Sequence, residues 1–130
     1  MIHKLNFFDM TRKIKFRGKK HTDEWLYGDL VHSTDNKIFI YPLDCEGLFL
    51  QNEVDTNTIG QFTGLYDKNG REIYEGDIVK STFTTYIVTW DKECACFSLK
   101  EDNTPHLLAD YIDDIEVFGN IYDNPELLNK

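Results

Sequence analysis

The segment Ile59–Lys80, which reads IGQFTGLYDKNGREIYEGDIVK, constrains the fold of this chain more than any other stretch. Asp67 stands where a type I turn favours a short side-chain acceptor, and Gly70 stands three residues later, where the backbone needs a positive φ. The pattern therefore predicts a type I turn followed by a glycine bulge. A two-residue type I′ turn centred on Asn69 and Gly70 is the alternative.

Two short arms flank this turn, at Gln61–Tyr66 and Arg71–Tyr74, and either turn type joins them into a hairpin. A second turn is predicted at Tyr74–Asp77, and the next strand begins at Ile78. The glycine and acidic residues here are expected to set the path of the backbone rather than to bind a ligand. The residues with this structural role are Asp67, Asn69, Gly70, Gly76 and Asp77.

The length and composition predict a globular protein of one ordinary domain or two very small ones. The chain has 130 residues, of which 41% are hydrophobic, so a real core can form and disorder is not expected. No apolar run approaches the roughly 20 residues that cross a bilayer, and the N-terminus has no apolar secretion signal. Together with an odd count of 3 cysteines, these features predict reduced thiols and a cytoplasmic protein without membrane contact.

The net charge of −9 is unevenly distributed. Residues 1–20 carry 7 basic side chains and 1 acidic one, whereas residues 21–130 carry 7 basic and 22 acidic ones. The body of the protein is therefore strongly acidic. This disfavours general nucleic-acid binding through its surface, because phosphate contacts need cations.

The most basic stretch, Arg12–Lys20, alternates between apolar and cationic side chains. Ile14 and Phe16 point one way and Lys13, Lys15 and Arg17 the other, which predicts a half-buried strand with a cationic face. Three interpretations are open: an edge strand protected by its charges, an arm that binds nucleic acid, or a basic face that docks onto the acidic body within or between chains. The candidate interaction surface comprises Arg12, Lys13, Lys15, Arg17, Lys19, Lys20, Trp25 and Tyr27.

Several further segments have the composition and alternation of strands. They are Glu24–His32, Lys37–Tyr41, Thr85–Trp90, Ala95–Leu99 and Ile115–Tyr122. Asp44–Asn57 is expected to be a loop with a short strand at Leu48–Leu50, and Glu101–His106 a second loop. Leu107–Asp114 is expected to be a short helix or an irregular acidic connection, and Pro125 starts a helical turn. No other segment keeps a helical period, so the predicted fold class is mainly β.

An internal sequence match suggests two related halves. Gly28–Thr34 (GDLVHST) matches Gly76–Thr82 (GDIVKST), and Ile59–Phe62 weakly matches Phe118–Ile121. Five short strands in each half suit a small SH3-like barrel, so we expect two SH3-like β-barrel halves packed together with a shared core. The expected boundaries are an N-terminal extension at 1–11, a first half at 12–65, and a second half with a C-terminal tail at 66–130.

Three groups of residues are similar to a known family. The central group joins Ile59–Leu65, Asp67–Gly70 and Glu72–Val79, and shorter groups lie at Ile14–Arg17 and at Gly119–Tyr122 with Asn124–Leu128. On these motifs the chain resembles the YopX family of phage and prophage proteins, and the resemblance runs over most of residues 12–128. The resemblance implies a phage or prophage origin, a cytoplasmic β-rich protein and homo-oligomerisation. It implies no activity and brings no catalytic residue.

Cys94 and Cys96 form a C-x-C pair, which is the first candidate for chemistry. On a strand their side chains share one face, as two metal ligands would. Cys45 and the 4 histidines, however, give no second ligand pair at zinc spacing. Buried small residues of a strand are therefore the favoured interpretation, and a zinc site is the alternative.

An acidic cluster is the second candidate. Carboxylates of this kind hold Mg²⁺ in metal-dependent nucleases, but a solvated acidic loop, or a counterpart of the basic strand, is favoured. The Asp67–Gly70 turn does not have the ligand spacing of a calcium loop. We therefore predict no metal, no cofactor and no catalytic residue. The cluster consists of Asp110, Asp113, Asp114 and Glu116.

The leading functional hypothesis is a non-enzymatic phage accessory protein that acts through protein–protein contacts. Self-association comes first, with the basic strand of one subunit on the acidic surface of the next, and a host or phage protein is a further possible partner. One alternative is a nucleic-acid-binding regulator that uses the basic N-terminal strand, with Trp25 or Tyr27 stacking on bases. Another is an acidic protein that imitates nucleic acid and inhibits a host DNA-binding protein. An enzyme is the last choice.

Overall fold

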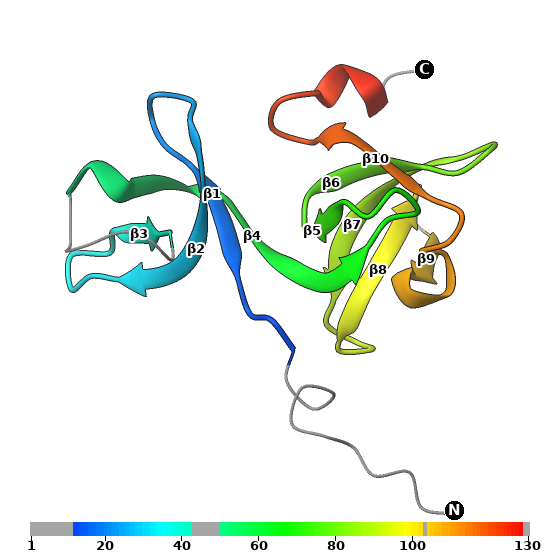
Figure 1. Cartoon of the computed structure of the whole chain (residues 1–130), viewed down its shortest axis with the longest axis horizontal. Helices are drawn as coiled ribbons and strands as arrows, with labels where there is room; N and C mark the ends of the chain where they lie inside the picture. The colour runs from blue at the N-terminus through cyan, green and yellow to red at the C-terminus, as the bar shows by residue number, and fades with distance from the viewer. Residues whose placement is uncertain (1–11, 43–49, 103, 129–130) are drawn as a thin grey trace, which may run out of the picture.

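A computed structural model describes residues 12–42, 50–102 and 104–128, and these residues form a mainly β structure, as predicted (Figure 1). The elements in chain order are β1 Phe16–Lys19, β2 Trp25–His32, β3 Ile38–Tyr41, η1 Leu50–Asn52, β4 Glu53–Tyr66, β5 Glu72–Tyr74, β6 Asp77–Lys80, β7 Thr85–Asp91, β8 Cys96–Glu101, β9 Thr104–Leu107, η2 Leu108–Asp110, β10 Glu116–Asn120 and η3 Pro125–Leu128. The η elements are single 3₁₀ turns.

The strands form two antiparallel sheets (Figure 1). The first has the order β1-β2-β3-β4-β5, and β1 also pairs with β4. The second has the order β10-β6-β7-β8-β9. The sheets are not closed barrels, so the predicted pair of SH3-like barrels is not confirmed. Within the described ranges, no helix has the length and apolar character needed to span a membrane.

Two segments expected to be loops are partly strands. Glu53–Asn57 opens β4, where the buried Val54 lies opposite Ile38 of β3. Thr104–Leu107 is β9 at the edge of the second sheet, a position that tolerates Pro105 because one side of the strand needs no partner. Of the short strand predicted at Leu48–Leu50, only Leu50 lies among the described residues, and it begins η1.

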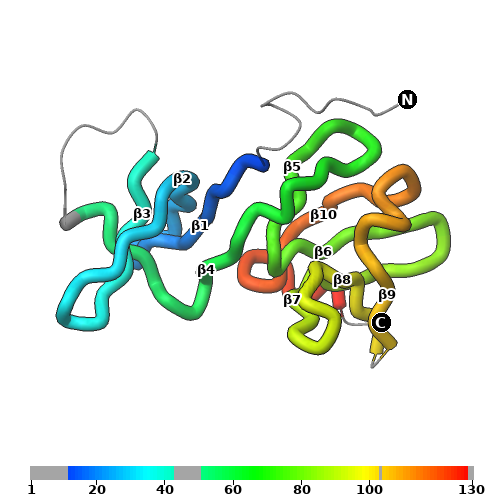
Figure 2. The backbone as a smooth tube through the Cα atoms, turned by 90° about the horizontal axis from the view of Figure 1, so that it is seen from below, coloured from blue at the N-terminus to red at the C-terminus, as the bar shows by residue number. Residues whose placement is uncertain are grey.

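Strand β4 runs from one half of the molecule to the other (Figure 1, Figure 2). It pairs first with β3, then with β1 and finally with β5. Its register with β1 shifts between Asp55 and Gly60, so β4 bulges at this point. Leu65 near its end and Ile73 of β5 pack into the core of the second sheet. One strand therefore belongs structurally to both halves.

The second sheet buries an apolar core that β5 of the first sheet completes. Val88 of β7 lies opposite Leu99 of β8, and η2 adds the fully buried Leu108. Burial of one such side chain contributes about 1.5–3 kcal/mol, so the whole cluster is a large stabilising term. Its buried members are Ile73, Val79, Tyr86, Val88, Leu99, Leu108, Ile115 and Val117.

The two segments of the internal sequence match differ in local structure at their glycines. Gly28 lies inside β2, opposite Phe16 of β1, whereas Gly76 lies in the turn before β6 with a φ of 94°. Asp29, which follows the first glycine, is exposed, whereas Asp77, which follows the second, is buried. At the turn that contains Gly76 the chain enters the second sheet. The boundary expected between residues 65 and 66 stays a prediction.

Candidate functional site

Strand β1 lies in the interior of the first sheet and connects the two halves. It pairs with β2 on one side and with β4 on the other, so the interpretation as an edge strand is wrong. The strand is also shorter than predicted, because residues 12–15 precede it. Ile14 is exposed while Arg17 is buried. The alternation is therefore opposite to the expected one at these two positions.

The Arg17 side chain reaches from β1 to the second sheet and forms a buried ion pair there. Its Nη2 lies 2.8 Å from Oδ1 of Asp77, with the two side chains only 6% and 2% exposed. The same nitrogen is 3.4 Å from the carbonyl oxygen of Glu75, to which it donates. The second carboxylate oxygen of Asp77 accepts the amide of Tyr74 at 2.7 Å. Two residues that are 60 positions apart thus join the sheets.

Two aromatic rings enclose the Arg17 guanidinium. Its central carbon lies 5.0 Å from the ring centre of Trp25 and 4.9 Å from that of Tyr74. Such cation–π contacts contribute about 2 kcal/mol when they are desolvated. In the part of the chain that the structure describes, Nε of Arg17 is buried without a hydrogen-bond acceptor. Burial raises the pKa of Asp77, and the charge of Arg17 opposes this effect.

Two further cations of the basic stretch pair with acidic residues far away in the sequence. Lys15 Nζ lies 2.7 Å from Oε2 of Glu72. Lys19 Nζ lies 2.6 Å from Oδ1 of Asp123, whose other oxygen accepts the indole N–H of Trp25 at 2.7 Å. The hydrogen bond from Lys19 to Asp123 raises the pKa of Lys19. The basic face therefore docks onto the acidic body within one chain, which is the third of the three interpretations.

The remaining predicted surface residues are placed differently. Lys20 contacts its neighbour Glu24 at 3.5 Å. Arg12 and Lys13 are exposed ahead of β1. The half-exposed Tyr27 packs its ring edge-on to Tyr74 at 5.5 Å. The structure thus brings Lys15, Arg17, Lys19, Trp25 and Tyr27 together around the junction of the sheets and leaves Arg12 and Lys13 outside it.

A cavity of about 320 Å³ lies beside this junction. Its charged lining is balanced, with two arginines and two carboxylates, and these groups already have partners within the chain. Arg71, for example, donates from Nη1 to the carbonyl oxygen of Val117 at 3.1 Å. The arrangement supports a structural connection between the sheets rather than a catalytic centre. The lining residues are Arg17, Tyr27, Arg71, Glu72, Tyr74, Asp77 and Val117.

The central turn has the first of the two predicted geometries. The amide of Gly70 donates to the carbonyl of Asp67 at 3.0 Å, and Gly70 has a φ of 83° while Asn69 has no positive φ. The Asp67 carboxylate accepts the amides of Asn69, Arg71 and Val117, each at 2.9 Å. Burial opposes ionisation of Asp67, but these amides outweigh burial and lower its pKa. Asp67 therefore holds the hairpin against β10.

The favoured interpretation of the C-x-C pair, as two buried residues of a strand, is wrong. Cys94 is exposed in the turn between β7 and β8, and Cys96 begins β8 half-buried. Both are free thiols, and Cys45 lies outside the described residues. Among residues 12–42, 50–102 and 104–128 there is no group of three side chains suited to hold a metal ion. In the acidic cluster, Asp110, Asp113 and Asp114 are exposed.

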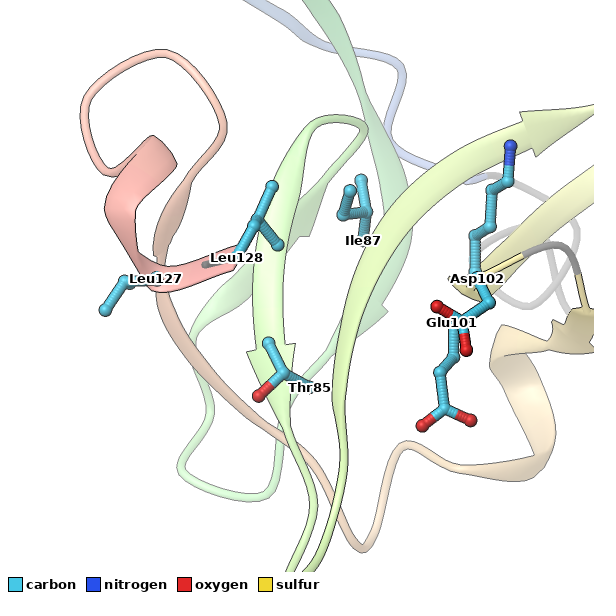
Figure 3. Close-up of a pocket in the computed structure, with 7 residues that line it drawn as sticks. Thr85, Ile87, Glu101, Asp102, Leu127 and Leu128 are labelled. Carbon is cyan, nitrogen blue, oxygen red and sulfur yellow. The ribbon is translucent and has the colours of Figure 1, made fainter. Parts of the chain in front are cut away.

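A second cavity, of about 360 Å³, lies between η3 and the outer face of the second sheet (Figure 3). Ile87 of β7 and Leu128 of η3 line its apolar part, and Lys100, Glu101 and Asp102 line its charged part. No catalytic pairing of these side chains is evident among the described residues. The sequence did not single out this place, because η3 and β7 are distant in the chain.

Large apolar side chains are exposed on the second half of the protein. Phe83, in the turn between β6 and β7, is 96% exposed. Trp90, Leu107 and Phe118 are each about half exposed. Scattered apolar residues on a surface are ordinary, but an aromatic ring with almost no contact to its own chain is not. Sequence reasoning missed these positions, because alternation does not show which side chains of a turn stay uncovered.

Family comparison identifies the chain. The family model described as YopX protein matches residues 15–129. The chain belongs to the YopX family. The resemblance seen in the motifs of this YopX family member is therefore confirmed.

Solved structures include relatives of this YopX family member, and three chains match. One is described as the crystal structure of protein EF1440 from Enterococcus faecalis. It is 25% identical, with a TM-score of 0.61, and the match covers 92% of this chain and 100% of that chain. No curated protein matches the sequence.

Proposed function

We propose that this YopX family member is a non-enzymatic phage or prophage accessory protein that acts through protein–protein contacts, first of all with other copies of itself. The observation that carries the proposal is the exposure of Phe83, at the tip of the β6–β7 hairpin, which projects from the body (Figure 1). Aromatic side chains are enriched among the residues that anchor protein interfaces. The half-exposed Phe118 lies beside Lys80, at the end of β6 that leads into this turn.

The ion pairs of the basic stretch change how such an association would work. Lys15, Arg17 and Lys19 are paired inside the chain, so they are not free to dock onto a neighbouring subunit. Apolar contacts through the second half are better supported than the electrostatic docking first considered. The same pairing weakens the nucleic-acid alternative, for which Arg12 and Lys13 are the exposed cations that remain.

The test measures the molar mass by light scattering over a range of protein concentrations, for the native chain and for Phe83→Ser. Thr82→Ala, at an exposed neighbour in the same turn, is the matched control. We expect the native chain and the control to associate and Phe83→Ser to associate at least about tenfold more weakly, since the loss of one anchor costs 1.4 kcal/mol or more. Monomers at every concentration would contradict self-association.

Salt and nucleic acid separate the alternatives. Apolar association persists or strengthens as salt rises, whereas association through charges weakens. A gel shift at low salt that disappears in Arg12→Gln/Lys13→Gln would support the nucleic-acid-binding regulator instead. Recovery of a host DNA-binding protein in a pull-down would support the acidic inhibitor.

A further inference from the structure

The turn between β7 and β8 holds two thiols in a defined backbone. The Asp91 carboxylate accepts the amides of Glu93 at 3.0 Å and Cys94 at 3.4 Å, which fixes the start of the turn. Cys96 ends it and pairs with Asp91 across the hairpin. The turn therefore places the exposed Cys94 and the half-buried Cys96 on either side of a single residue, Ala95.

Ala95 has a φ of 53°, which lies in the left-handed region. In an extended strand the Cα atoms of residues i and i+2 are roughly 7 Å apart, which is too far for a disulfide. A left-handed central residue shortens this separation to roughly 5.5 Å, within the range of about 4.4–6.8 Å that disulfides span. The conformation of Ala95 thus brings the two flanking cysteines to a separation that a disulfide can bridge.

We propose that Cys94 and Cys96 form a surface dithiol that closes reversibly to a disulfide by exchange with small disulfides of the glutathione class. The thiolate of Cys94 attacks one sulfur of the small disulfide, forms a mixed disulfide and releases one small thiolate. The thiolate of Cys96 then attacks the Cys94 sulfur, forms the Cys94–Cys96 bond and releases the second small thiolate. The two protein thiols lose two protons and two electrons, and the small disulfide is reduced to two thiols.

Asp91 raises the pKa of the Cys94 thiol most strongly, followed by burial and by Cys96. The exchange should therefore be fastest above neutral pH, where more of Cys94 is thiolate. The exposure of Cys94 gives a small disulfide access to it. Trp90 and Phe97, at the adjacent strand ends, pack edge-on with ring centres 5.0 Å apart, so indole fluorescence can report on a change in the turn.

The experiment uses the full chain with Cys45→Ser, so that Cys94 and Cys96 are its only thiols. The folded protein is incubated with oxidised glutathione and its intact mass is measured. We expect a loss of two hydrogen masses, reversed by reduced glutathione, and a single glutathione adduct in the control Cys45→Ser/Cys96→Ser. Accumulation of two glutathione adducts on the parent would overturn the proposal. So would an unchanged mass under conditions in which the urea-unfolded chain reacts.

Ala95 variants test the geometric basis separately. Ala95→Gly keeps the left-handed conformation accessible, so closure should match the parent. Ala95→Val disfavours it, and we expect the glutathione ratio at half closure to shift by about tenfold toward the oxidised side. Equal closure in both variants would show that the left-handed turn does not bring the thiols together.

Discussion

Strands β6, β7, β8 and β10 share a continuous apolar cluster with Ile73 of β5, whereas the part of the first sheet formed by β1, β2, β3 and the start of β4 buries fewer large apolar side chains. In that part, Phe39, Ile40 and Val54 are buried, and a buried ion pair joins it to the second sheet. Burial of apolar area is non-directional, while an ion pair needs both partners in place. The comparison suggests that the second half carries most of the stability and that the first half depends on the geometry of its attachment.

Replacement of Asp77 by Ala should have the largest effect. It leaves the charged Arg17 buried without its partner and leaves the amide of Tyr74 without an acceptor. Loss of one member of a buried pair costs about 3–5 kcal/mol, measurable as a fall in the free energy of unfolding in urea. In the double variant Arg17→Met/Asp77→Leu, which removes both charges, much of the loss should be recovered. A cost below about 1 kcal/mol for Asp77→Ala would show that the pair does not hold the sheets together.

Two valines with the same burial offer a matched comparison of the two sheets. Val88 in the second sheet and Val54 in the first are each 1% exposed. Val88→Ala should lower the free energy of global unfolding by about 2.5 kcal/mol. Val54→Ala should instead mainly accelerate amide hydrogen exchange in β2 and β3, because the first sheet can open locally. Equal effects of both variants on every strand would mean that the halves unfold as one unit.

Asp67 links the hairpin to β10 and should make the stability depend on pH. Its pKa is lowered in the folded protein, so its contribution is present above the unfolded value of about 3.9 and is lost as the pH falls through the folded value. Asp67→Asn should cost about 1.5 kcal/mol at pH 7, and this difference should shrink in acid. The exposed Asp113→Asn is the control. A difference independent of pH would exclude an ionic role for Asp67.

The smallest expected effect belongs to the partly exposed pair of Lys15 and Glu72. Lys15→Met should cost about 0.5 kcal/mol in low salt, because solvent screens such pairs. The cost should fall further in high salt. Thermal unfolding at two salt concentrations measures both values. A larger, salt-independent loss would assign Lys15 to the buried junction together with Arg17.

The sequence predicted well the parts of this protein that depend on neighbouring residues. The turn at Asp67–Gly70 follows from local hydrogen bonding and from the freedom of Gly70. Strand β7 was placed within one residue, because Tyr86 and Val88 alternate with more exposed positions. The predicted mainly β character follows from the same local patterns.

The parts that were missed depend on contacts between distant residues. Nothing near Arg17 in the sequence shows that Asp77 completes a buried pair with it, and alternation alone placed Arg17 on one outward face with Lys13 and Lys15. The sequence did contain one indication of these ion pairs. Positive charge is concentrated in the first 20 residues and negative charge in the rest, and this pattern favoured docking as one interpretation. Phe83 was missed because exposure in a turn depends on what the rest of the fold leaves uncovered.

Strand β4 limits how this protein can be recombined with its relatives. A chimaera that joined residues 12–65 of one family member to the remainder of another would take β4 from one parent and β5 from the other. Leu65 would then meet an unmatched apolar core, and Arg17 would meet an Asp77 held in a different backbone. The two halves should therefore be exchangeable between relatives only when β4 and the strands that pair with it come from the same parent.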